Sequence, residues 1–343
     1  SRPVPEDLLP WAMSALGESA SAAPPLSPVA GDASSRRYFR FALGGRKHVL
    51  AEAPPETEKN DEFLAVRAML EAQGVRVPAL VGADLNRGYL LLEDLGDRLL
   101  LPELDDASVD AHYRSAFDVL LQVAAVDTRG SGLDAYDRAL LEEELGRFGE
   151  WFVAGLLGYA PTEEEQSLLR EVSDRLVESA LEQPRVLVHR DFHSRNLMLV
   201  GDDELAVIDF QDAVIGPVTY DPVSLLRDCY IRWPASRVRD WALDYHRLLS
   251  DRGMLPDVPE DRFLRWFDWM GLQRHIKVLG TFARLYLRDG KPAYLDDLPL
   301  VIRYVSEILE QYAPQEPLFA ALGDWFETRL SPLVAVQDWS VAR

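Results

Sequence analysis

The sequence predicts an α+β fold with two lobes, a small antiparallel β lobe with one main helix and a large, mainly helical lobe. Three observations predict it. Short apolar runs separated by turn residues fill the first part of the chain, a polar break follows at residues 93–97, and helical periodicity dominates beyond the break. We therefore expect one lobe at residues 1–95, with a hinge at its end, and a second at residues 96–343.

The first lobe begins with a short helical pattern around residues 8–16, and residues 19–28 are typical of a loop. Residues 38–43 and 48–51 flank a Gly-Gly turn, which predicts two paired strands. Apolar residues at helical spacing predict a helix at residues 61–73, and two short apolar runs predict strands at residues 79–83 and 89–92.

Helical spacing of apolar residues fills most of the second lobe. Three helices are expected first, at about residues 107–126, 136–157 and 163–182. Short strands connected by polar turns follow, at residues 186–188, 197–200 and 205–208. Residues 221–330 are then mainly helical in pattern.

Composition and charge exclude several classes of protein. Of the 343 residues, 48% are hydrophobic and 27% are charged, which is typical of a globular enzyme. No apolar run reaches 18 residues, so no membrane span is predicted. The net charge of −21 disfavours nucleic acid and anionic lipid as partners. A single cysteine, Cys229, and the lack of a signal-peptide pattern at the start predict a cytoplasmic protein.

The residues that carry chemistry follow the short strands of the second lobe. Asp191 comes three residues after an apolar strand, Asn196 comes five residues later, and Asp209 follows the next apolar run. Phosphoryl transfer needs a carboxylate that orients the attacking hydroxyl and accepts its proton, and oxygen ligands that hold Mg²⁺. The pattern therefore predicts Asp191 as the catalytic residue and Asn196 and Asp209 as the metal ligands.

The motif from His189 to Asn196, H-x-D-x-x-x-x-N, and the later Asp209-Phe210-Gln211 resemble the protein-kinase superfamily. The third residue of the second motif is not Gly, and no Ala-Pro-Glu follows, as in the small-molecule branch of aminoglycoside and choline kinases. The resemblance implies a bilobal protein-kinase-like fold, ATP and Mg²⁺ as cofactors, and a small hydroxyl compound as acceptor.

Longer segments narrow the resemblance to bacterial anomeric sugar kinases, and these segments are residues 31–40, 209–221, 270–280 and 284–292. That resemblance implies phosphorylation of the C1 hydroxyl of N-acetylmuramate and N-acetylglucosamine in cell-wall recycling. It also implies that His189 packs under the catalytic loop and that Asp221 braces it. Glu93 and Leu95 lie where the family binds adenine through backbone groups, and Ser34 lies in the loop expected over the phosphates.

The strand at residues 48–53 has no Lys where protein kinases carry one. Cations for the phosphates are therefore expected from Arg36, Arg37 and Arg40, because Arg binds phosphate through two N–H groups. Strand alternation places Arg36 and Arg40 on one face and Arg37 with Phe39 on the other. Since Phe39 should face the core, Arg36 and Arg40 are the favoured pair.

The resemblance implies an acceptor site along Gln273, Arg274 and His275, on a helix that lines the cleft. Arg274 could meet the lactyl carboxylate of N-acetylmuramate, or instead form a salt bridge with a neighbour on its helix.

Two alternative functions stay open on the sequence alone. One is a kinase for a different hydroxyl substrate, such as an aminoglycoside, choline or homoserine. The other is a nucleotide-binding pseudokinase, suggested by the missing Lys and disfavoured because Asp191, Asn196 and Asp209 are all present.

Overall fold

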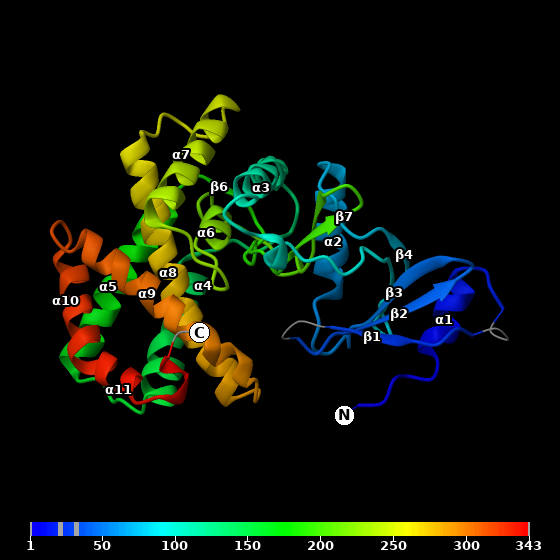
Figure 1. Cartoon of the computed structure of the whole chain (residues 1–343), viewed down its shortest axis with the longest axis horizontal. Helices are drawn as coiled ribbons and strands as arrows, with labels where there is room; N and C mark the ends of the chain where they lie inside the picture. Colours follow the sequence, from blue (N-terminus) through cyan, green and yellow to red (C-terminus); the bar gives the residue numbers. More distant parts are fainter. Residues whose placement is uncertain (1, 20–22, 31–33, 342–343) are drawn as a thin grey trace. The chain divides into compact units, whose positions relative to one another are not determined.

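The structure, a computed structural model, describes residues 2–19, 23–30 and 34–341 (Figure 1). Gly31, Asp32 and Ala33 of the predicted phosphate loop lie outside the described residues. The chain forms two compact units. The first comprises Ser1–Gln122 with Arg195–Ala213, and the second comprises Val123–Ser194 with Val214–Arg343.

The first unit is built on an antiparallel sheet of five strands in the order β1-β2-β3-β5-β4. The strands are β1 (Ser27–Val29), β2 (Arg37–Leu43), β3 (Arg46–Glu52), β4 (Leu80–Asp84) and β5 (Tyr89–Glu93). Four of them were expected, whereas β1 begins within the segment predicted as a loop. Pro28 is tolerated there because β1 is an edge strand, where the ladder does not need every N–H donor.

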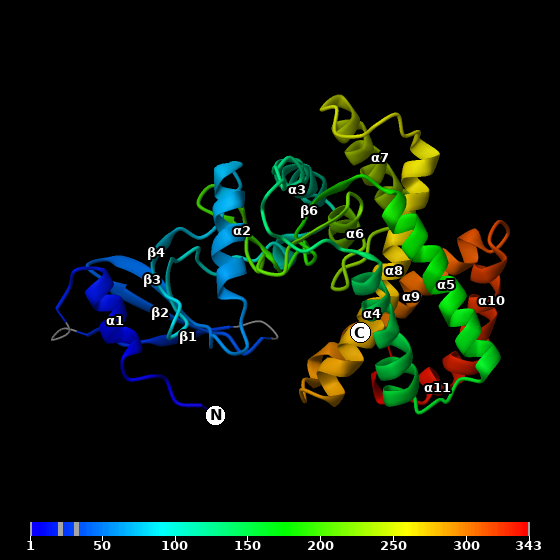
Figure 2. The ribbon, with the colours of Figure 1, turned by 180° about the vertical axis from the view of Figure 1, so that it is seen from behind.

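Two helices pack with this sheet, α1 (Leu8–Ala15) and α2 (Asn60–Ala72). Figure 2 shows α1 beside the sheet strands. Its Leu8, Ala12 and Met13 are buried in one cluster with Phe39 and Phe41 of β2. The i, i+4, i+5 spacing of these three residues puts them on one side of the helix, so α1, which was expected as a short helix at residues 8–16, completes the core of the unit.

A distant segment of the chain joins the first unit through a second strand pair, β7 (Leu197–Val200) and β8 (Glu204–Val207). The Leu100 N–H donates to the Leu197 carbonyl at 2.8 Å, and the Leu199 N–H donates to the Arg98 carbonyl at 2.8 Å. Helix α3 (Val109–Ala124) follows the short η2 turn (Leu101–Glu103). The predicted lobe boundary after residue 95 stays a prediction.

The second unit is helical except for one strand pair, β6 (Arg185–Val188) with β9 (Val214–Pro217). Its helices are α4 (Arg138–Arg147), α5 (Glu163–Glu182), α6 (Tyr220–Leu226), α7 (Ala235–Asp251), α8 (Glu260–Leu287), α9 (Leu298–Tyr312), α10 (Pro317–Trp325) and α11 (Ser331–Ala335). Two π-helices, η3 (Phe148–Leu156) and η5 (Phe326–Leu330), and two 3-10 helices, η4 (Pro292–Asp297) and η6 (Asp338–Ser340), connect or extend them. None of the described helices is long and apolar enough to cross a bilayer. The predicted α+β class is confirmed.

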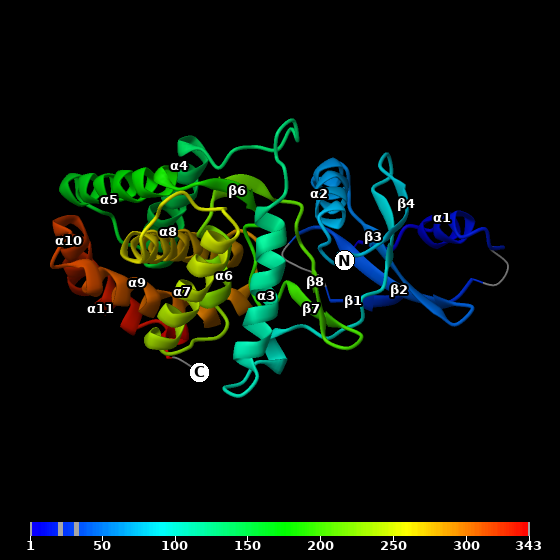
Figure 3. The ribbon, with the colours of Figure 1, turned by 90° about the horizontal axis from the view of Figure 1, so that it is seen from above.

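Helix α8 is the centre of this unit and lies between α5 and α9 (Figure 3). The helix predicted at residues 136–157 is divided, because α4 ends at Arg147 and η3 continues as a π-helix from Phe148. Gly280 of α8 meets the backbone at this junction. A Cβ at position 280 would lie 2.3 Å from the Arg147 carbonyl carbon and 2.5 Å from the Phe148 nitrogen.

We therefore expect Gly280→Ala to destabilise the protein by about 3 kcal/mol, because backbone atoms cannot move aside as a flexible side chain can. Thermal unfolding followed by circular dichroism should show a melting temperature lower by about 6 °C or more. Gly146→Ala in α4 is the matched control. A Cβ at position 146 would meet none of the described side chains within 4 Å, so this variant should be neutral or raise stability by about 0.5–1 kcal/mol. Equal melting temperatures for the two variants would contradict the packing argument.

Candidate active site

The loop that carries Asp191 begins at the end of β6 and is held by a buried carboxylate. Asp221 of α6 accepts the His189 N–H at 2.8 Å and the Arg190 N–H at 3.1 Å. Arg190 has a positive φ of 85°, a conformation that costs a non-glycine residue free energy. Burial raises the pKa of Asp221. Asp221 thus fixes the backbone immediately before Asp191.

His189 lies under the same loop. Its side chain is buried, and its Nδ1 accepts the Asp191 N–H at 3.1 Å. The ring contacts Phe192 edge-on, with 5.9 Å between ring centroids. These contacts are those of a packing residue that orients the Asp191 backbone.

The Asp191 carboxylate faces cations of the second unit. Arg274 of α8 is close to it, with Nη2 lying 3.9 Å from Oδ1. Burial by itself would raise the pKa of Asp191, but the charges of Lys277, His193 and Arg274 outweigh it and lower the pKa. The Asp191 side chain keeps 42% of its surface exposed, which limits the effect of burial. Asp191 is therefore ionised at neutral pH and can accept a hydrogen bond from a hydroxyl.

A buried ionic network next to this loop was missed by the sequence analysis. Glu144 of α4 is buried and pairs both with Arg190 and with Lys277 of α8, whose Nζ lies 3.0 Å away. The Tyr136 hydroxyl donates to Glu144, and the Lys277 ammonium donates to the Tyr220 hydroxyl at 3.0 Å. The sequence did carry one signal for this network, because each of the two helices has a charged residue at a position that faces the interior. Glu144 is followed by the buried Leu145, and Lys277 lies within an apolar run of α8.

The predicted metal ligands belong to the first unit. Asn196 precedes β7 and Asp209 follows β8, and the Asn196 amide donates to Asp209 Oδ2 at 3.4 Å. The Ile208 N–H donates to the Asn196 carbonyl at 3.1 Å, which ties the two segments together. Asp209 has a positive φ of 58°. The amide and carboxylate side chains thus lie side by side, and each carries an oxygen of the kind that Mg²⁺ binds together with phosphate and water.

The segment after Asp209 is anchored on helix α2. Phe210 stacks on Phe63, with 4.9 Å between ring centroids, and Lys59 pairs with Asp212 at 3.1 Å. Gln211 donates to Asp209 Oδ1 at 2.5 Å. Both the backbone and the carboxylate of Asp209 are thus fixed by residues of the first unit.

Two of the three arginines expected at the phosphates pair with glutamates. The Arg36 side chain is buried and pairs with Glu58 at 3.1 Å, and the backbone N–H of Arg36 donates to the Ser34 hydroxyl at 3.2 Å. Arg37 donates through Nε to Glu52 at 2.6 Å. Contact of these arginines and Ser34 with phosphate stays a prediction.

The alternation predicted for this strand is present. Phe39 is 5% exposed and belongs to the core, and the Arg37 guanidinium lies over its ring at 5.5 Å. Arg40, on the other face of β2, pairs with Asp94 at 2.5 Å.

Two arginines, Arg40 and Arg76, bind the carboxylates of the segment predicted as the hinge. Arg40 bonds both oxygens of Asp94, which raises the pKa of Arg40 and keeps it charged. Arg76 makes two hydrogen bonds of 2.7 Å to Glu93. The Leu95 side chain packs in a small apolar cluster with Met198 and Ala206 of the first unit. The side chains of Glu93 and Leu95 are therefore occupied, and the Glu93 N–H donates to the Ala79 carbonyl at 2.9 Å. Binding of adenine by the backbone of this segment stays a prediction.

The predicted acceptor residues all lie in α8 and are buried. His275 bonds the Arg227 carbonyl at 3.0 Å and stacks on Tyr304 at 4.6 Å. Burial lowers the pKa of His275 to about 3, so this ring is neutral and belongs to the helix packing. Oε1 of Gln273 is enclosed without a hydrogen-bond partner among the described residues. Of the three, the structure brings Arg274 next to Asp191.

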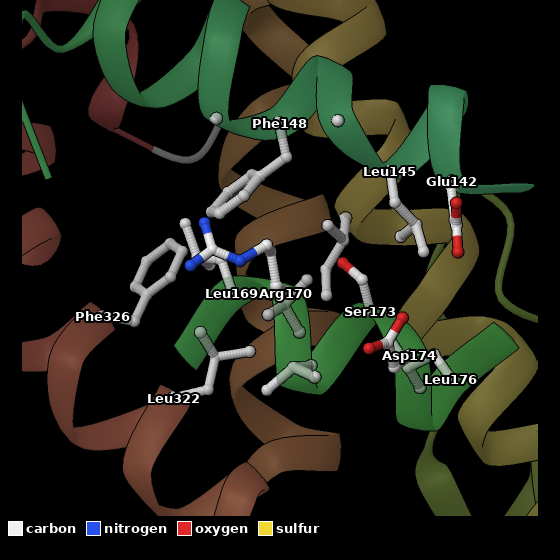
Figure 4. Close-up of a pocket in the computed structure, with 15 residues that line it drawn as sticks. Glu142, Leu145, Phe148, Leu169, Arg170, Ser173, Asp174, Leu176, Leu322 and Phe326 are labelled. Atoms are coloured by element: carbon white, nitrogen blue, oxygen red, sulfur yellow. The ribbon is translucent and has the colours of Figure 1, made fainter. Parts of the chain in front are cut away.

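A separate apolar cavity of about 340 Å³ lies among α4, η3, α5 and α10. Phe148, Leu322 and Phe326 line it, and Arg170 extends between the aromatic rings (Figure 4). No residue predicted for catalysis or binding lines this cavity, so we do not assign it to the active site.

Lys277→Met should raise the pKa of Asp191, because it removes the strongest of the charges that lower it. A carboxylate with a lowered pKa stays ionised as the pH falls, so loss of this charge should move the acid limb of the kcat/KM profile to higher pH. Lys277→Arg keeps the charge and should leave the limb in place. An unmoved limb in Lys277→Met, in a folded variant, would show that Lys277 does not act on Asp191.

Comparison with known proteins places these features in a family. The model of the phosphotransferase enzyme family matches residues 25–264. A protein of Pseudomonas aeruginosa named N-acetylmuramate/N-acetylglucosamine kinase is 44% identical over 300 residues, which cover 87% of each chain. A protein of Neisseria meningitidis with the same name is 39% identical over 303 residues, covering 87% of this chain and 89% of the relative.

The fold is shared with solved kinases of low sequence identity. A choline kinase from Streptococcus pneumoniae matches with a TM-score of 0.60 and 14% identity, covering 88% of this chain and 99% of that one. An ADP-bound aminoglycoside phosphotransferase matches with a TM-score of 0.59 and 13% identity, covering 89% and 99%. The predicted kinase-like fold is confirmed, and the chain belongs to the phosphotransferase enzyme family.

Proposed function

We propose that this protein transfers the γ-phosphate of MgATP to the C1 hydroxyl of N-acetylmuramate and N-acetylglucosamine. The observation that carries the proposal is the ionised Asp191 in a loop braced by Asp221 and flanked by buried cations. Relatives of 39–44% identity that bear the name of this activity support the choice of acceptor.

In this mechanism Asp191 accepts a hydrogen bond from the acceptor hydroxyl and points its oxygen at the phosphorus. A carboxylate of lowered pKa is a weak base, so its main contribution is orientation, with the proton accepted late in the transfer. The two backbone hydrogen bonds to Asp221 keep the loop, and hence the carboxylate, in one position.

Asn196 and Asp209 would hold Mg²⁺, which neutralises charge on the phosphates when bound. Asp209 would bring the formal charge and Asn196 a neutral oxygen. Only four residues separate Asp191 from Asn196 in the chain, and we propose that both serve the same transfer. The backbone at Glu93 and Leu95 would bind adenine, and Arg36, Arg37, Arg40 and Ser34 would lie toward the triphosphate.

The charges around Asp191 favour this acceptor over the alternatives. Arg190, Arg274 and Lys277 are cations of the second unit close to the catalytic loop. They would repel a polycationic aminoglycoside or the quaternary ammonium of choline. A pseudokinase would have no need of a carboxylate held in a strained loop beside cations.

Asp191→Asn should lower kcat by about 10²–10⁴-fold, because the amide cannot accept the proton and orients the hydroxyl poorly. MgATP affinity should stay close to that of the wild type. Transfer from ATP to N-acetylglucosamine, followed by NMR of the product anomer, measures the effect. Asp244→Asn, an exposed residue of α7, is the control and should keep full rate. A variant with more than about a tenth of the wild-type rate removes Asp191 from catalysis.

Asp209→Ala should weaken MgATP binding by about 10-fold or more, whereas ATP titrated without the metal should bind the variant and the wild type alike. Isothermal titration calorimetry of both proteins, with and without Mg²⁺, measures the affinity for MgATP and the affinity for free ATP separately. Asp212→Ala is the control three residues further along, since it removes a half-exposed carboxylate paired with Lys59. Unchanged MgATP affinity in Asp209→Ala would place the metal elsewhere.

A further inference from the structure

Arg274 is a buried cation whose donors are poorly satisfied. Its side chain is 5% exposed, and a guanidinium has five N–H donors. Within the described parts of the chain it contacts the Cys229 thiol at 3.5 Å and Asp191 Oδ1 at 3.9 Å, and it makes no hydrogen bond to an oxygen atom. Its Nε is enclosed without a partner among the described residues.

Neither contact neutralises this charge well. Burial raises the pKa of the Cys229 thiol to about 11, so the sulfur is uncharged at neutral pH and a weak acceptor. The distance of 3.9 Å to Asp191 exceeds that of a hydrogen bond. Asp228, the residue before Cys229, uses its carboxylate to accept N–H groups of Ser194 and Tyr230 and the Ser194 hydroxyl.

Three partly buried cations of the second unit, by contrast, pair closely with a carboxylate. Lys277 is 3.0 Å from Glu144, which also pairs with Arg190, and Arg227 pairs with Asp268 at 2.7 Å. The sequence left a salt bridge within α8 as the alternative role of Arg274, and the described residues of that helix provide none. A buried guanidinium whose only hydrogen-bond acceptor is a weak one is costly, and a ligand that supplied oxygen acceptors would remove that cost.

A pair of oxygens in one plane is what a guanidinium fork binds best, and a carboxylate provides it. N-acetylmuramate is N-acetylglucosamine with a lactyl ether that carries a carboxylate, and the rest of the two sugars is shared. Resting on the proposed function, we infer that Arg274 binds the lactyl carboxylate and is the residue that distinguishes the acidic sugar from the neutral one.

The test compares three acceptors, N-acetylmuramate, its uncharged lactamide and N-acetylglucosamine. Arg274→Met should lower kcat/KM for N-acetylmuramate by about 10- to 100-fold, the value of a charge-assisted hydrogen bond pair. Because Arg274 also acts on Asp191, part of the loss should be common to all three acceptors, and the loss for the two neutral ones should be at least about tenfold smaller than for the acid. Arg274→Lys should recover part of the loss for the acid, because it restores the charge without the fork. Arg265→Met, the same exchange nine residues earlier in α8, should leave all three values unchanged.

Several results decide against the inference. An equal loss for all three acceptors in Arg274→Met, at an unchanged melting temperature, would show that Arg274 binds a shared group or the phosphate. If Arg274→Met does not fold, the comparison is made with the wild type and Arg274→Lys. A wild type whose kcat/KM is no higher for N-acetylmuramate than for its lactamide would then overturn the inference. Absence of transfer to all three acceptors by the wild type would instead refute the proposed function.

Discussion

The buried carboxylate of Glu144 is the constraint on which the second unit depends. It pairs with both Arg190 and Lys277 of α8, and it accepts a hydrogen bond from the Tyr136 hydroxyl. Removing it would leave two cations in a poorly hydrated position, which costs several kcal/mol. The same pairing fixes α4 against α8 and places the charge of Lys277 where it lowers the pKa of Asp191. The packing of α4 on α8 and the ionisation of Asp191, the proposed catalytic residue, therefore depend on the same pairing.

Backbone strain is concentrated at the residues proposed for chemistry. In the described part of the chain, three residues other than glycine have positive φ, and they are Arg190, Asp203 and Asp209. Asp203 lies in a turn between β7 and β8, whereas the other two lie in the loops that carry the proposed catalytic and metal groups. Such backbone conformations are kept where several contacts with the surrounding structure hold the chain in place. Asp221 does so for one loop, and the stack of Phe210 on Phe63 does so for the other.

The distribution of charge explains how a strongly acidic chain can handle anions. The net charge of −21 gives an unfavourable field at long range, but that field is screened beyond about 8–10 Å in physiological salt. At short range the second unit differs from this average, because Arg274 lies 3.9 Å from the partly exposed Asp191 carboxylate and the charge of Lys277, which pairs with Glu144, also lowers the pKa of Asp191. The proposed binding of an anionic acceptor would then depend on these local contacts and not on the net charge.

Local patterns in the sequence determined the α+β class, the strands and helices near the site, and the order of Asp191, Asn196 and Asp209, because periodicity and motif spacing are properties of neighbouring residues. They did not reveal the pairing of Glu144 with Lys277, which lie 133 positions apart and meet only when α4 packs on α8. The partners of Arg36, Arg37 and Arg40, the π-helical turn after Arg147 and the open donors of Arg274 were likewise decided by tertiary packing. Burial and long-range contact set the partners of a charged side chain, and neither is encoded by its immediate neighbours in the chain.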